Sequence, residues 1–583
     1  MDRILATDVI NNESKKVLLK GWIQNKRDHN HFAFIDLRDS SGIVQLYINF
    51  DNSLLADTFK SDCSIESVIS VEGTVVRRAE ELINKKLDTG EFEVKVDTLT
   101  VLSKSDTIPF AVDTDGHEIN EAIRLKYRYL DLRRKRMQDM LKFRNDFIFF
   151  TRSWYQNHGF IEVETPLLTV TSPEGSRDFL VPSRLHKGKF YVLPQAPQQF
   201  KQLLMVAGVG KYFQIAPCFR DEDPRSDRHA GAFYQIDTEI AFTNQEDFFQ
   251  EMEPFFIEIT EKLTNKKVKF KPFPRIPYDD AIDKYGSDKP DLRFGIEITD
   301  CKYLKENISL NAFDGMEAMK CLIVPNADRF DRKTISDLGA SAINSGGKGL
   351  AYILRDENGE FKSPLKNYLN DNIYQYLMNE LHLERNCIMF IVADSYKLTT
   401  KILGEIRLKI GDILNLRNKD EIAYAWIVDF PMYEWSDDLK KYDFMHNPFS
   451  MPQGGMEALQ QRNPLDIYAY QYDIVANGLE LSSGAIRNHE SETLIKAFEI
   501  AGYKKEEVEE KFKGLLTAFR YGVPPHGGFA PGVDRTIMLL RDEPDIREIY
   551  AFPLSSDAKD LMMGAPSEVS KSQLDDVGLK INV

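Results

Sequence analysis

Two neighbouring runs in the middle of the chain alternate apolar and polar residues: Tyr212-Phe-Gln-Ile-Ala-Pro-Cys-Phe-Arg-Asp-Glu222 and Ala232-Phe-Tyr-Gln-Ile-Asp-Thr-Glu-Ile240. This period predicts two strands joined by a loop, with polar and charged side chains on one face and apolar side chains on the other. The apolar face suits a hydrophobic core. Because burying unpaired charges against protein is costly, the polar face is expected to line a cleft.

The cleft face of this hairpin carries side chains suited to a purine triphosphate. Arg220 is a candidate for binding a phosphate, Glu222 for binding an amino group, and Phe233 for stacking on the base. The loop between the two runs is basic as well, with Arg225, Arg228 and His229. An ordinary charged hairpin without a ligand is the alternative interpretation of these residues alone.

The same hairpin carries a recognisable motif. Its Cys218-Phe-Arg-Asp-Glu222 and Gln235-Ile-Asp237 resemble motif 2 of the class II aminoacyl-tRNA synthetases, above all the bacterial-type aspartyl enzymes of that family. The resemblance covers nearly the whole chain and implies a multidomain α+β protein. It implies an N-terminal OB-fold β-barrel, a class II catalytic domain built on an antiparallel sheet, and an inserted α+β domain. The chain departs from the motif at Ala232, where relatives have glutamate, and at His229, where they often have glutamine.

Composition excludes several classes of protein. A chain of 583 residues is too long for one core and predicts roughly three or four domains. Its 42% hydrophobic and 28% charged residues are ordinary for a globular protein, and with no long apolar run or signal peptide we expect a cytoplasmic protein. The five scattered cysteines support neither a disulfide framework nor a zinc site. A net charge of −16 argues against indiscriminate nucleic-acid binding but permits a local basic groove.

Residues 1–104 predict a nucleic-acid-binding barrel. Five strand-like runs, with one short helix after the third, suit an OB fold, whose face binds single-stranded nucleic acid. The predicted strands are 17–24, 32–37, 42–48, 68–77 and 91–102, and the predicted helix is 53–59.

Several side chains on this barrel are candidate contacts to nucleic acid. Phe34 suits stacking on a base, and Gln45, Glu91 or Glu93 suit base edges, with a solvated or structural role as the alternative for each. The basic candidates for phosphate contacts are Lys20, Lys26, Arg27 and Arg38. The resemblance assigns the tRNA anticodon to Arg27, Phe34, Gln45 and Glu93.

His29 bears on the choice of tRNA. In the family, histidine at this position tends to accompany enzymes that charge both tRNA(Asp) and tRNA(Asn), whereas leucine tends to accompany enzymes restricted to tRNA(Asp). The resemblance therefore favours the non-discriminating form, with Asn84 as a second determinant. A surface histidine without this role is the alternative.

Residues 105–135 are predicted to be a hinge, and the first part of the catalytic domain covers 136–283. A helix at its start places four aromatic residues on one face: Phe143, Phe147, Phe150 and Trp154. The run Phe160-Ile-Glu-Val-Glu-Thr-Pro166 resembles motif 1, which implies a homodimer. Spacing alone indicates only a buried helix and an edge strand stopped by proline.

The amino-acid site is implied by residues from separate segments. Ser172-Pro-Glu-Gly-Ser-Arg-Asp178 predicts a lid rich in turn residues, in which the family's glutamate, Glu174 here, accepts from the substrate α-ammonium. Lys201 matches a lysine that binds the side-chain carboxylate, while Ala196 stands where many relatives carry serine. The implied aspartate-binding residues are Glu174, Gln198, Lys201, Arg220, Gln235, Asp237, His446 and Arg487.

Residues 284–415 change in pattern, because strands alternate with helices in a separate α+β unit. This unit resembles the insertion domain of bacterial-type aspartyl enzymes, and no chemistry is evident in it. The catalytic domain resumes over 416–583, which includes motif 3 and a C-terminal extension.

The resumed domain completes the nucleotide site. Asp473 and Glu480 are candidate ligands for Mg²⁺, which is usually held by one or two carboxylates plus phosphates. The run Gly528-Phe-Ala-Pro-Gly-Val-Asp-Arg535 resembles motif 3, whose arginine holds the γ-phosphate. The implied ATP-binding residues are Arg220, Asp221, Glu222, Arg228, His229, Phe233, Glu480, Gly532, Val533, Asp534 and Arg535.

The resemblance implies an aspartate–tRNA ligase that takes ATP, L-aspartate and tRNA(Asp), with tRNA(Asn) as a further substrate of the non-discriminating form. Arg220 is the implied catalytic residue. One alternative is a ligase that makes asparagine from aspartate and ammonia, but a free amino-acid product needs no anticodon reader. Another is a non-catalytic nucleic-acid-binding protein on a synthetase scaffold. The retained polar residues argue against it: Arg220, Glu222, Asp473, Glu480 and Arg535.

Overall fold

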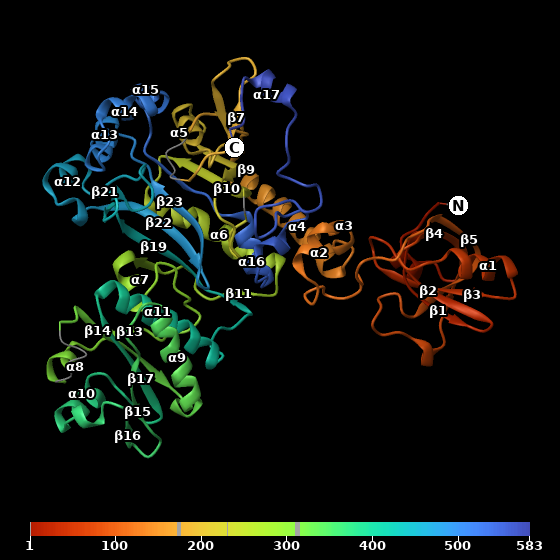
Figure 1. Ribbon diagram of the computed structural model, residues 1–583, viewed down its shortest axis with the longest axis horizontal. Helices are drawn as coiled ribbons and strands as arrows, with labels where there is room; N and C mark the ends of the chain where they lie inside the picture. The colour runs from red at the N-terminus through yellow and green to blue at the C-terminus, as the bar shows by residue number, and fades with distance from the viewer. Residues whose placement is uncertain (1, 172–175, 230, 309–314, 583) are drawn as a thin grey trace. The chain divides into compact units, whose positions relative to one another are not determined.

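The described part of the chain forms two compact units. The computed structural model describes residues 2–171, 176–229, 231–308 and 315–582 (Figure 1). Its contacts divide these residues into a unit that ends at Gln138 and a unit that begins at Asp139. In this part of the chain no helix combines the length and the apolar character needed to cross a membrane.

The first unit is a closed five-stranded barrel with the strand order β1-β2-β3-β5-β4. Neighbouring strands pair antiparallel except β3 and β5, which are parallel. Every second residue of each strand points inward, so side chains such as Ile23, Ile35 and Val44 fill the interior. The predicted OB fold is confirmed. Its elements are β1 (Lys16–His29), β2 (Phe32–Arg38), β3 (Ile43–Asn49), α1 (Ser53–Asp62), β4 (Val68–Arg77) and β5 (Phe92–Ser103).

An eight-stranded sheet organises the second unit, in the order β12-β19-β22-β23-β24-β10-β9-β6. The two outermost pairs are parallel and the others antiparallel. The central hairpin is β9–β10, and its register sets Phe233 opposite Cys218 and Asp237 opposite Gln214, so the polar residues share one face as predicted. The strands are β6 (Ile161–Glu162), β9 (Lys211–Arg220), β10 (Gly231–Ala241), β12 (Arg275–Pro277), β19 (Tyr424–Pro431), β22 (Tyr468–Ala476), β23 (Leu479–Ile486) and β24 (His526–Phe529).

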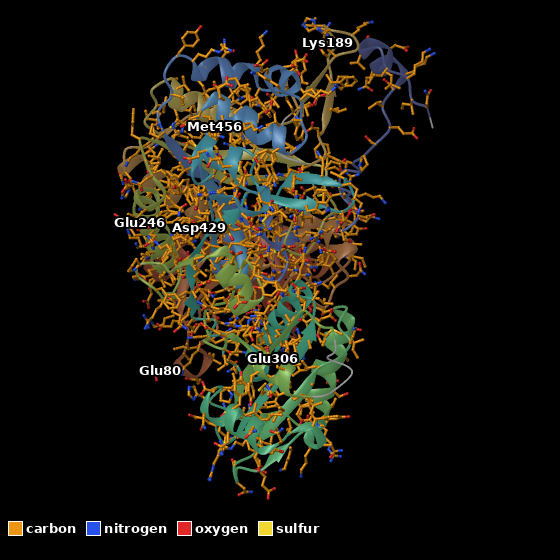
Figure 2. The ribbon with its side chains drawn as sticks, turned by 90° about the vertical axis from the view of Figure 1, so that its left-hand side faces the viewer. Glu80, Lys189, Glu246, Glu306, Asp429 and Met456 are labelled. Atoms are coloured by element: carbon orange, nitrogen blue, oxygen red, sulfur yellow. The ribbon has the colours of Figure 1, made fainter. Side chains whose placement is uncertain are left out.

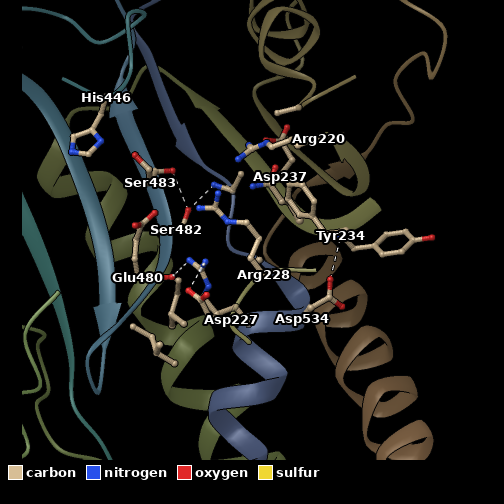
Figure 3. A pocket seen from close by; sticks show the side chains of 18 of the residues that line it. Arg220, Asp227, Arg228, Tyr234, Asp237, His446, Glu480, Ser482, Ser483 and Asp534 are labelled. Carbon is tan, nitrogen blue, oxygen red and sulfur yellow. Dashed lines mark hydrogen bonds and ion pairs between the residues drawn. The ribbon is translucent and has the colours of Figure 1, made fainter. Parts of the chain in front are cut away.

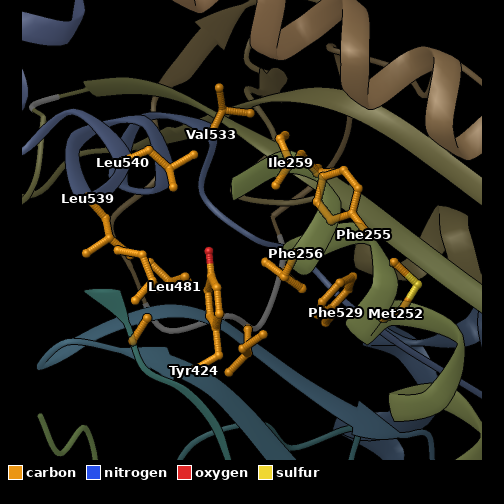
Figure 4. Close-up of a cluster of buried hydrophobic side chains, with 14 of the residues drawn as sticks. Met252, Phe255, Phe256, Ile259, Tyr424, Leu481, Phe529, Val533, Leu539 and Leu540 are labelled. Atoms are coloured by element: carbon orange, nitrogen blue, oxygen red, sulfur yellow. The ribbon is translucent and has the colours of Figure 1, made fainter. Parts of the chain in front are cut away.

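The apolar face of this sheet packs against two helices, α6 (Gln245–Leu263) and α16 (Val533–Arg541). Figure 4 shows Phe256 of α6 and Leu540 of α16 gathered around Tyr424 of the sheet. Burial of large apolar side chains on both sides of the interface stabilises this layer, at about 25 cal/mol for each Å² removed from water. The opposite, polar face of β9 and β10 is left for the site.

Helix α4 (Lys135–Asn157) carries the predicted aromatic face. Phe143, Phe147 and Trp154 are buried in the same core, and Phe150 packs partly against it. The predicted strand over 160–166 is shorter than expected, because only the two residues of β6 pair with β9. The proline at the end of this run has no N–H to continue a ladder.

A second sheet forms the inserted α+β domain, in the antiparallel order β13-β14-β17-β15-β16. Alternate strand residues supply two separate cores, one with α9 and α11 and one with α8 and α10. Glu306, labelled in Figure 2, lies on α8. The elements are β13 (Ile298–Asp300), α8 (Lys302–Asn307), β14 (Ala318–Pro325), α9 (Arg332–Asn344), β15 (Ala351–Arg355), β16 (Phe361–Lys362), α10 (Asp371–Asn379), β17 (Cys387–Asp394) and α11 (Tyr396–Ile413).

Candidate active site

A cavity of about 610 Å³ opens on the polar face of β9 and β10. Ligand sites in proteins commonly have volumes of roughly 300–1,000 Å³. Figure 3 shows Arg220 and Asp237 on one side of this cavity and His446 and Glu480 on the other. The predicted residues that line it are Gln198, Lys201, Arg220, Glu222, Arg228, His229, Phe233, Gln235, Asp237, His446, Glu480, Arg487, Gly532, Asp534 and Arg535.

Three predicted residues that the structure describes are not part of this wall. Asp221 is exposed, and its backbone N–H donates to the Arg177 carbonyl at 3.1 Å. Val533 is buried in the hydrophobic core, because its place in the first turn of α16 points it toward the sheet. Asp473 is buried in β22. Glu174 lies outside the described residues.

Two cations and two carboxylates form a buried cluster, and three of its members, Lys201, Asp237 and Arg487, line the cavity. Lys201, on α5 (Gln198–Val206), has its Nζ 2.6 Å from Asp237 Oδ1 and 3.4 Å from Glu239 Oε2. Arg487 donates from Nε to Glu239 Oε1 at 2.8 Å and from Nη2 to Oε2 at 3.0 Å. All four side chains are buried, and the strand period places both carboxylates on one face of β10. These ion pairs hold the two cations in fixed positions.

Two atoms of this cluster remain available to a ligand. Arg487 Nη1 and Asp237 Oδ2 are buried and have no hydrogen-bond partner within the described chain. Burial opposes ionisation of Glu239, but Arg487 and Lys201 together hold the pKa of its carboxyl below the ordinary value. Burial also raises the pKa of Asp237, which the charge of Lys201 only partly offsets. Because unpaired buried polar atoms are costly, a donor and an acceptor left here indicate where charged groups of a ligand fit.

The hairpin supplies a second group of cavity residues. The guanidinium of Arg220 lies over the Phe233 ring, with Cζ 5.0 Å from the ring centroid. Arg220 is half-buried, and its Nε has no hydrogen-bond partner among the residues that the structure covers. Glu222 pairs with Arg228 and accepts a hydrogen bond from the Ser176 hydroxyl. The cation of Arg220 is therefore the member of this group that is ready to meet an anion.

Arg535 enters the cavity from the first turn of α16. Its Nη1 donates to the Glu480 backbone carbonyl at 2.6 Å, and its Nη2 lies 3.6 Å from Asp227 Oδ2. These two contacts bring the arginine of the predicted motif 3 to the loop of the predicted motif 2. Arg220, Arg487 and Arg535, from three separate parts of the chain, thus line one cavity.

The two predicted magnesium carboxylates lie on neighbouring strands, Asp473 on β22 and Glu480 on β23. Burial and then the charge of Glu480 raise the pKa of Asp473 well above its ordinary value, and its buried Oδ1 has no partner in the described structure. A divalent cation would relieve both effects, so this donor set fits Mg²⁺. Over the described ranges, no group of three or more His, Cys, Asp or Glu is suited to a metal, so other oxygens would complete the coordination.

Two residues of the site were not predicted from the sequence. Glu239 bridges Lys201 and Arg487, and Lys289 lines the cavity with its Nζ 3.6 Å from Glu480 Oε2. The alternation that predicted Asp237 also places Glu239 on the same face, so a signal for Glu239 existed. Lys289 lies in a loop and has no periodic signal.

The predicted anticodon residues form one connected group on the barrel. Arg27 Nη2 donates to Gln45 Oε1 at 3.0 Å, and Gln45 Nε2 donates to Glu93 Oε2 at 2.8 Å. The guanidinium of Arg27 also lies over the Phe34 ring, with Cζ 5.6 Å from the centroid. Four strands, β1, β2, β3 and β5, thereby bring an aromatic ring and a polar edge together on one surface.

The two predicted discrimination residues have different surroundings. His29 stacks on Phe32 with ring centroids 4.8 Å apart. Asn84 lies in the loop between β4 and β5, where its Oδ1 accepts from the Lys86 N–H at 3.1 Å. His29 thus joins the aromatic surface that includes Phe34, whose ring centroid lies 6.0 Å away. Among the described contacts, none joins His29 to Asn84.

Comparison with known families agrees with this architecture. Residues 120–556 match the tRNA synthetases class II (D, K and N), and residues 17–102 match an OB-fold nucleic acid binding domain. An eight-stranded sheet with three arginines in one cavity, joined to an OB barrel, therefore defines a class II tRNA synthetase, an enzyme class that uses ATP as a substrate.

Individual relatives narrow the class. The chain is 48% identical to the aspartate–tRNA(Asp/Asn) ligase of Chlorobium phaeobacteroides (strain BS1) over 575 residues, 98% of this chain and 94% of the relative. It is also 48% identical to the aspartate–tRNA ligase of Streptomyces coelicolor (strain ATCC BAA-471 / A3(2) / M145), over 97% of this chain and 96% of the relative. The chain belongs to the aspartate–tRNA ligase family.

Solved structures share the fold at low sequence identity. The asparaginyl-tRNA synthetase from Pyrococcus horikoshii complexed with asparaginyl-adenylate superimposes with a TM-score of 0.59 at 18% identity, covering 95% of this chain and 98% of that chain. The aspartyl-tRNA synthetase from Entamoeba histolytica superimposes with a TM-score of 0.57 at 17% identity, covering 95% of this chain and 91% of that chain.

Proposed function

We propose that this protein activates L-aspartate with ATP and transfers the aspartyl group to the 3′ end of tRNA(Asp). The observation that carries the proposal is the buried cluster of Lys201, Arg487, Asp237 and Glu239, which leaves a cationic donor facing the cavity beside the hairpin arginine. The match to the aspartate–tRNA ligases supports it over nearly the full length of the chain.

Formation of the adenylate needs alignment rather than a general base. The α-carboxylate of aspartate is ionised at neutral pH, because such groups titrate near pH 3.5. Its oxygen attacks the α-phosphorus of ATP, a new O–P bond forms, and pyrophosphate leaves. We expect Arg220 to hold the carboxylate and the α-phosphate together while negative charge builds, and Arg535 to hold the γ-phosphate, since both arginines line the cavity.

Mg²⁺ fits this site through Asp473 and Glu480, and when bound it would neutralise charge on the triphosphate oxygens. Lys289, whose Nζ lies 3.6 Å from Glu480 Oε2, partly balances the negative charge of that carboxylate. The chain's own contribution is to hold the two carboxylates in fixed strands and to keep Arg535 next to them.

Selection of aspartate follows from the buried cluster. A side-chain carboxylate has two acceptor oxygens and can accept from both Arg487 Nη1 and Lys201 Nζ. The amide of asparagine has one acceptor and would turn its NH₂ donors toward a buried cation. A site of this kind rejects a mismatched polar group by about 10⁴-fold. We expect Asp237 Oδ2, which has no hydrogen-bond partner in the described structure, to accept from the α-ammonium.

A tRNA-charging assay tests this function and shows which tRNAs the protein accepts. Purified tRNA(Asp) and tRNA(Asn) are each incubated with the protein, ATP, Mg²⁺ and labelled aspartate. We expect both to be charged, since His29 favours the non-discriminating form. Charging of tRNA(Asp) alone would refute the relaxed range, and charging of neither would refute the ligase function.

Phe34 is expected to contribute to tRNA binding and not to amino-acid activation. Stacking of a base on an aromatic ring is worth about 1–3 kcal/mol, so Phe34→Ala should raise the KM for tRNA(Asp) by roughly 10- to 100-fold. Exchange of pyrophosphate without tRNA should be unchanged. Phe34→Tyr keeps the stacking face and is the matched control. An equal loss in Phe34→Tyr would contradict the stacking role.

A homodimer is expected to form around α4 and β6. Large apolar side chains there are exposed, including Phe149 at 73% and Ile161 at 56%. Ile161→Glu should weaken the dimer by about 3 kcal/mol, or roughly 10²-fold, because the charge is buried twice across a two-fold axis. Light scattering across a concentration series measures this change. Leu54→Glu, at a still more exposed apolar position on the barrel helix α1, is the control, and a monomeric wild-type protein would contradict the expectation.

A further inference from the structure

The loop that joins β9 and β10 is attached to a segment more than 300 residues later in the chain. The N–H of Ile546 donates to the Ser226 carbonyl at 2.7 Å. The N–H of Leu554 donates to His229 Nε2 at 3.0 Å. The loop carries Asp227, which lies next to Arg535, and therefore forms part of the cavity wall. Residues 546–554 thus fasten the loop at two points.

The second attachment depends on one tautomer of His229. Its Nδ1 lies 3.0 Å from the Ala232 carbonyl oxygen, which can only accept, so Nδ1 carries the proton. Its Nε2 accepts from the Leu554 N–H, which can only donate. Both ring nitrogens are therefore occupied by backbone groups, and the ring is neutral. His229 also lines the cavity, and its contact with the triphosphate stays a prediction.

Tyr550 provides the surface on which the imidazole rests. The two rings stack with centroids 4.3 Å apart and an interplanar angle of 25°. The Tyr550 hydroxyl donates to Asp534, and the guanidinium of Arg144 lies over the Tyr550 ring, with Cζ 5.4 Å from its centroid. Tyr550 does not line the cavity, so any effect of this ring on a ligand must act through its neighbours.

Asp534 fixes this surface to the catalytic sheet and to α4. Its Oδ1 pairs with Arg144 Nη1 at 2.5 Å, and its Oδ2 accepts from the Tyr234 backbone N–H at 3.2 Å. The carboxylate is buried in the first turn of α16, where the positive end of the helix dipole also favours it. The imidazole therefore docks on a rigid platform built from β10, α4 and α16.

We propose that His229 is a positioning residue for ATP: its imidazole fastens the β9–β10 loop to Tyr550 and Leu554, and so holds Asp227 and Arg228 at the cavity before the nucleotide arrives. The inference rests on the proposed function and deepens it. A loop that is already ordered does not draw on the binding energy of its ligand, whereas a released loop must be ordered when ATP binds. Loss of the attachment should thus weaken ATP binding and spare the chemical step.

The test compares variants in two assays. The first is binding of a non-hydrolysable ATP analogue to the full-length protein without aspartate, and the second is aspartate-dependent pyrophosphate exchange. His229→Ala should raise the dissociation constant of the analogue and the KM for ATP about 10-fold, with kcat within about twofold and the KM for aspartate unchanged. His229→Gln, whose carbonyl can replace the Nε2 acceptor, should recover most of the affinity. Ser226→Ala is the control on the same loop, because its attachment uses the backbone carbonyl.

Tyr550→Leu separates positioning from a direct phosphate contact. It removes the stacking surface without changing a cavity residue, and should weaken analogue binding about as much as His229→Ala, whereas Tyr550→Phe should not. The double variant His229→Ala/Tyr550→Leu should then be no weaker than either single variant, since both break the same attachment. Unchanged affinity in Tyr550→Leu, or additive losses in the double variant, would overturn the proposal. Melting curves confirm that each variant is folded. Absence of aspartate-dependent exchange in the wild-type protein would refute the proposed function, while the analogue assay would still test the positioning role.

Discussion

Replacing Arg220 with glutamine is expected to lower kcat for aspartate-dependent pyrophosphate exchange by about 10³-fold while the melting temperature stays unchanged. Arg220 stacks over Phe233 and is half-buried, and its Nε has no partner in the described structure. Its charge acts on the Glu222 carboxyl, but Arg228 pairs with that carboxyl too, so we expect the fold to lose little when the charge of Arg220 is removed. Its cation is needed when charge builds on the α-phosphate. Glutamine keeps a hydrogen-bond donor at about the position of Nε, but it is shorter than arginine and lacks both the charge and the forked Nη groups.

Arg184→Gln is the matched control for this prediction. Arg184 is an exposed arginine that does not line the cavity, so the same change there should leave exchange unaltered. Stopped-flow or isotope-exchange rates at saturating ATP and aspartate measure the chemical step. A loss of less than threefold in Arg220→Gln would remove this arginine from the reaction.

Replacing Arg487 with leucine is expected to abolish exchange, with a loss of at least about 10⁴-fold, and also to destabilise the protein. Arg487 is the bidentate partner of the buried Glu239, and removing one member of a buried ion pair costs about 3–5 kcal/mol. Loss of exchange in this variant could therefore come from lost substrate binding or from a less stable fold. The free energy of unfolding has to be measured beside the activity.

Arg487→Lys separates the two effects. Lysine keeps a cation opposite Glu239, so most of the stability should remain, but it lacks the fork that leaves Nη1 free for a substrate. We expect exchange to fall by roughly 10²- to 10³-fold, mainly through a higher KM for aspartate, with the KM for ATP unchanged. Near-normal use of aspartate by this variant would contradict the role of Nη1.

Much of the site was predictable because it lies on strands. A period of two residues places Arg220 on the cleft face of β9, and Gln235 and Asp237 on the same face of β10, and the structure confirms this register. The same period could not show whether a carboxylate on that face meets solvent or a buried cation. Glu239 was therefore missed as the residue that orients Lys201 and Arg487.

The unpredicted parts depend on contacts between distant segments. The loop after β9 is held by Leu554, 325 residues after His229, and no local pattern indicates this pairing. The prediction that His229 faces the triphosphate came from its place in the motif and not from its partners. The two-residue length of β6 likewise appears only in its pairing with β9, where Ile161 and Glu162 lie opposite Tyr212 and Phe213, and a single strand-like run does not show it.

Exchange of labelled pyrophosphate into ATP, with L-aspartate or L-asparagine as the sole amino acid, tests the central claim most directly. Arg220, Arg535, Lys201 and Arg487 all line one cavity, where we propose that they act on one small dicarboxylic acid and one nucleotide. We predict exchange with aspartate and at least about 10⁴-fold less with asparagine. Comparable exchange with both amino acids, or none with aspartate, would contradict it.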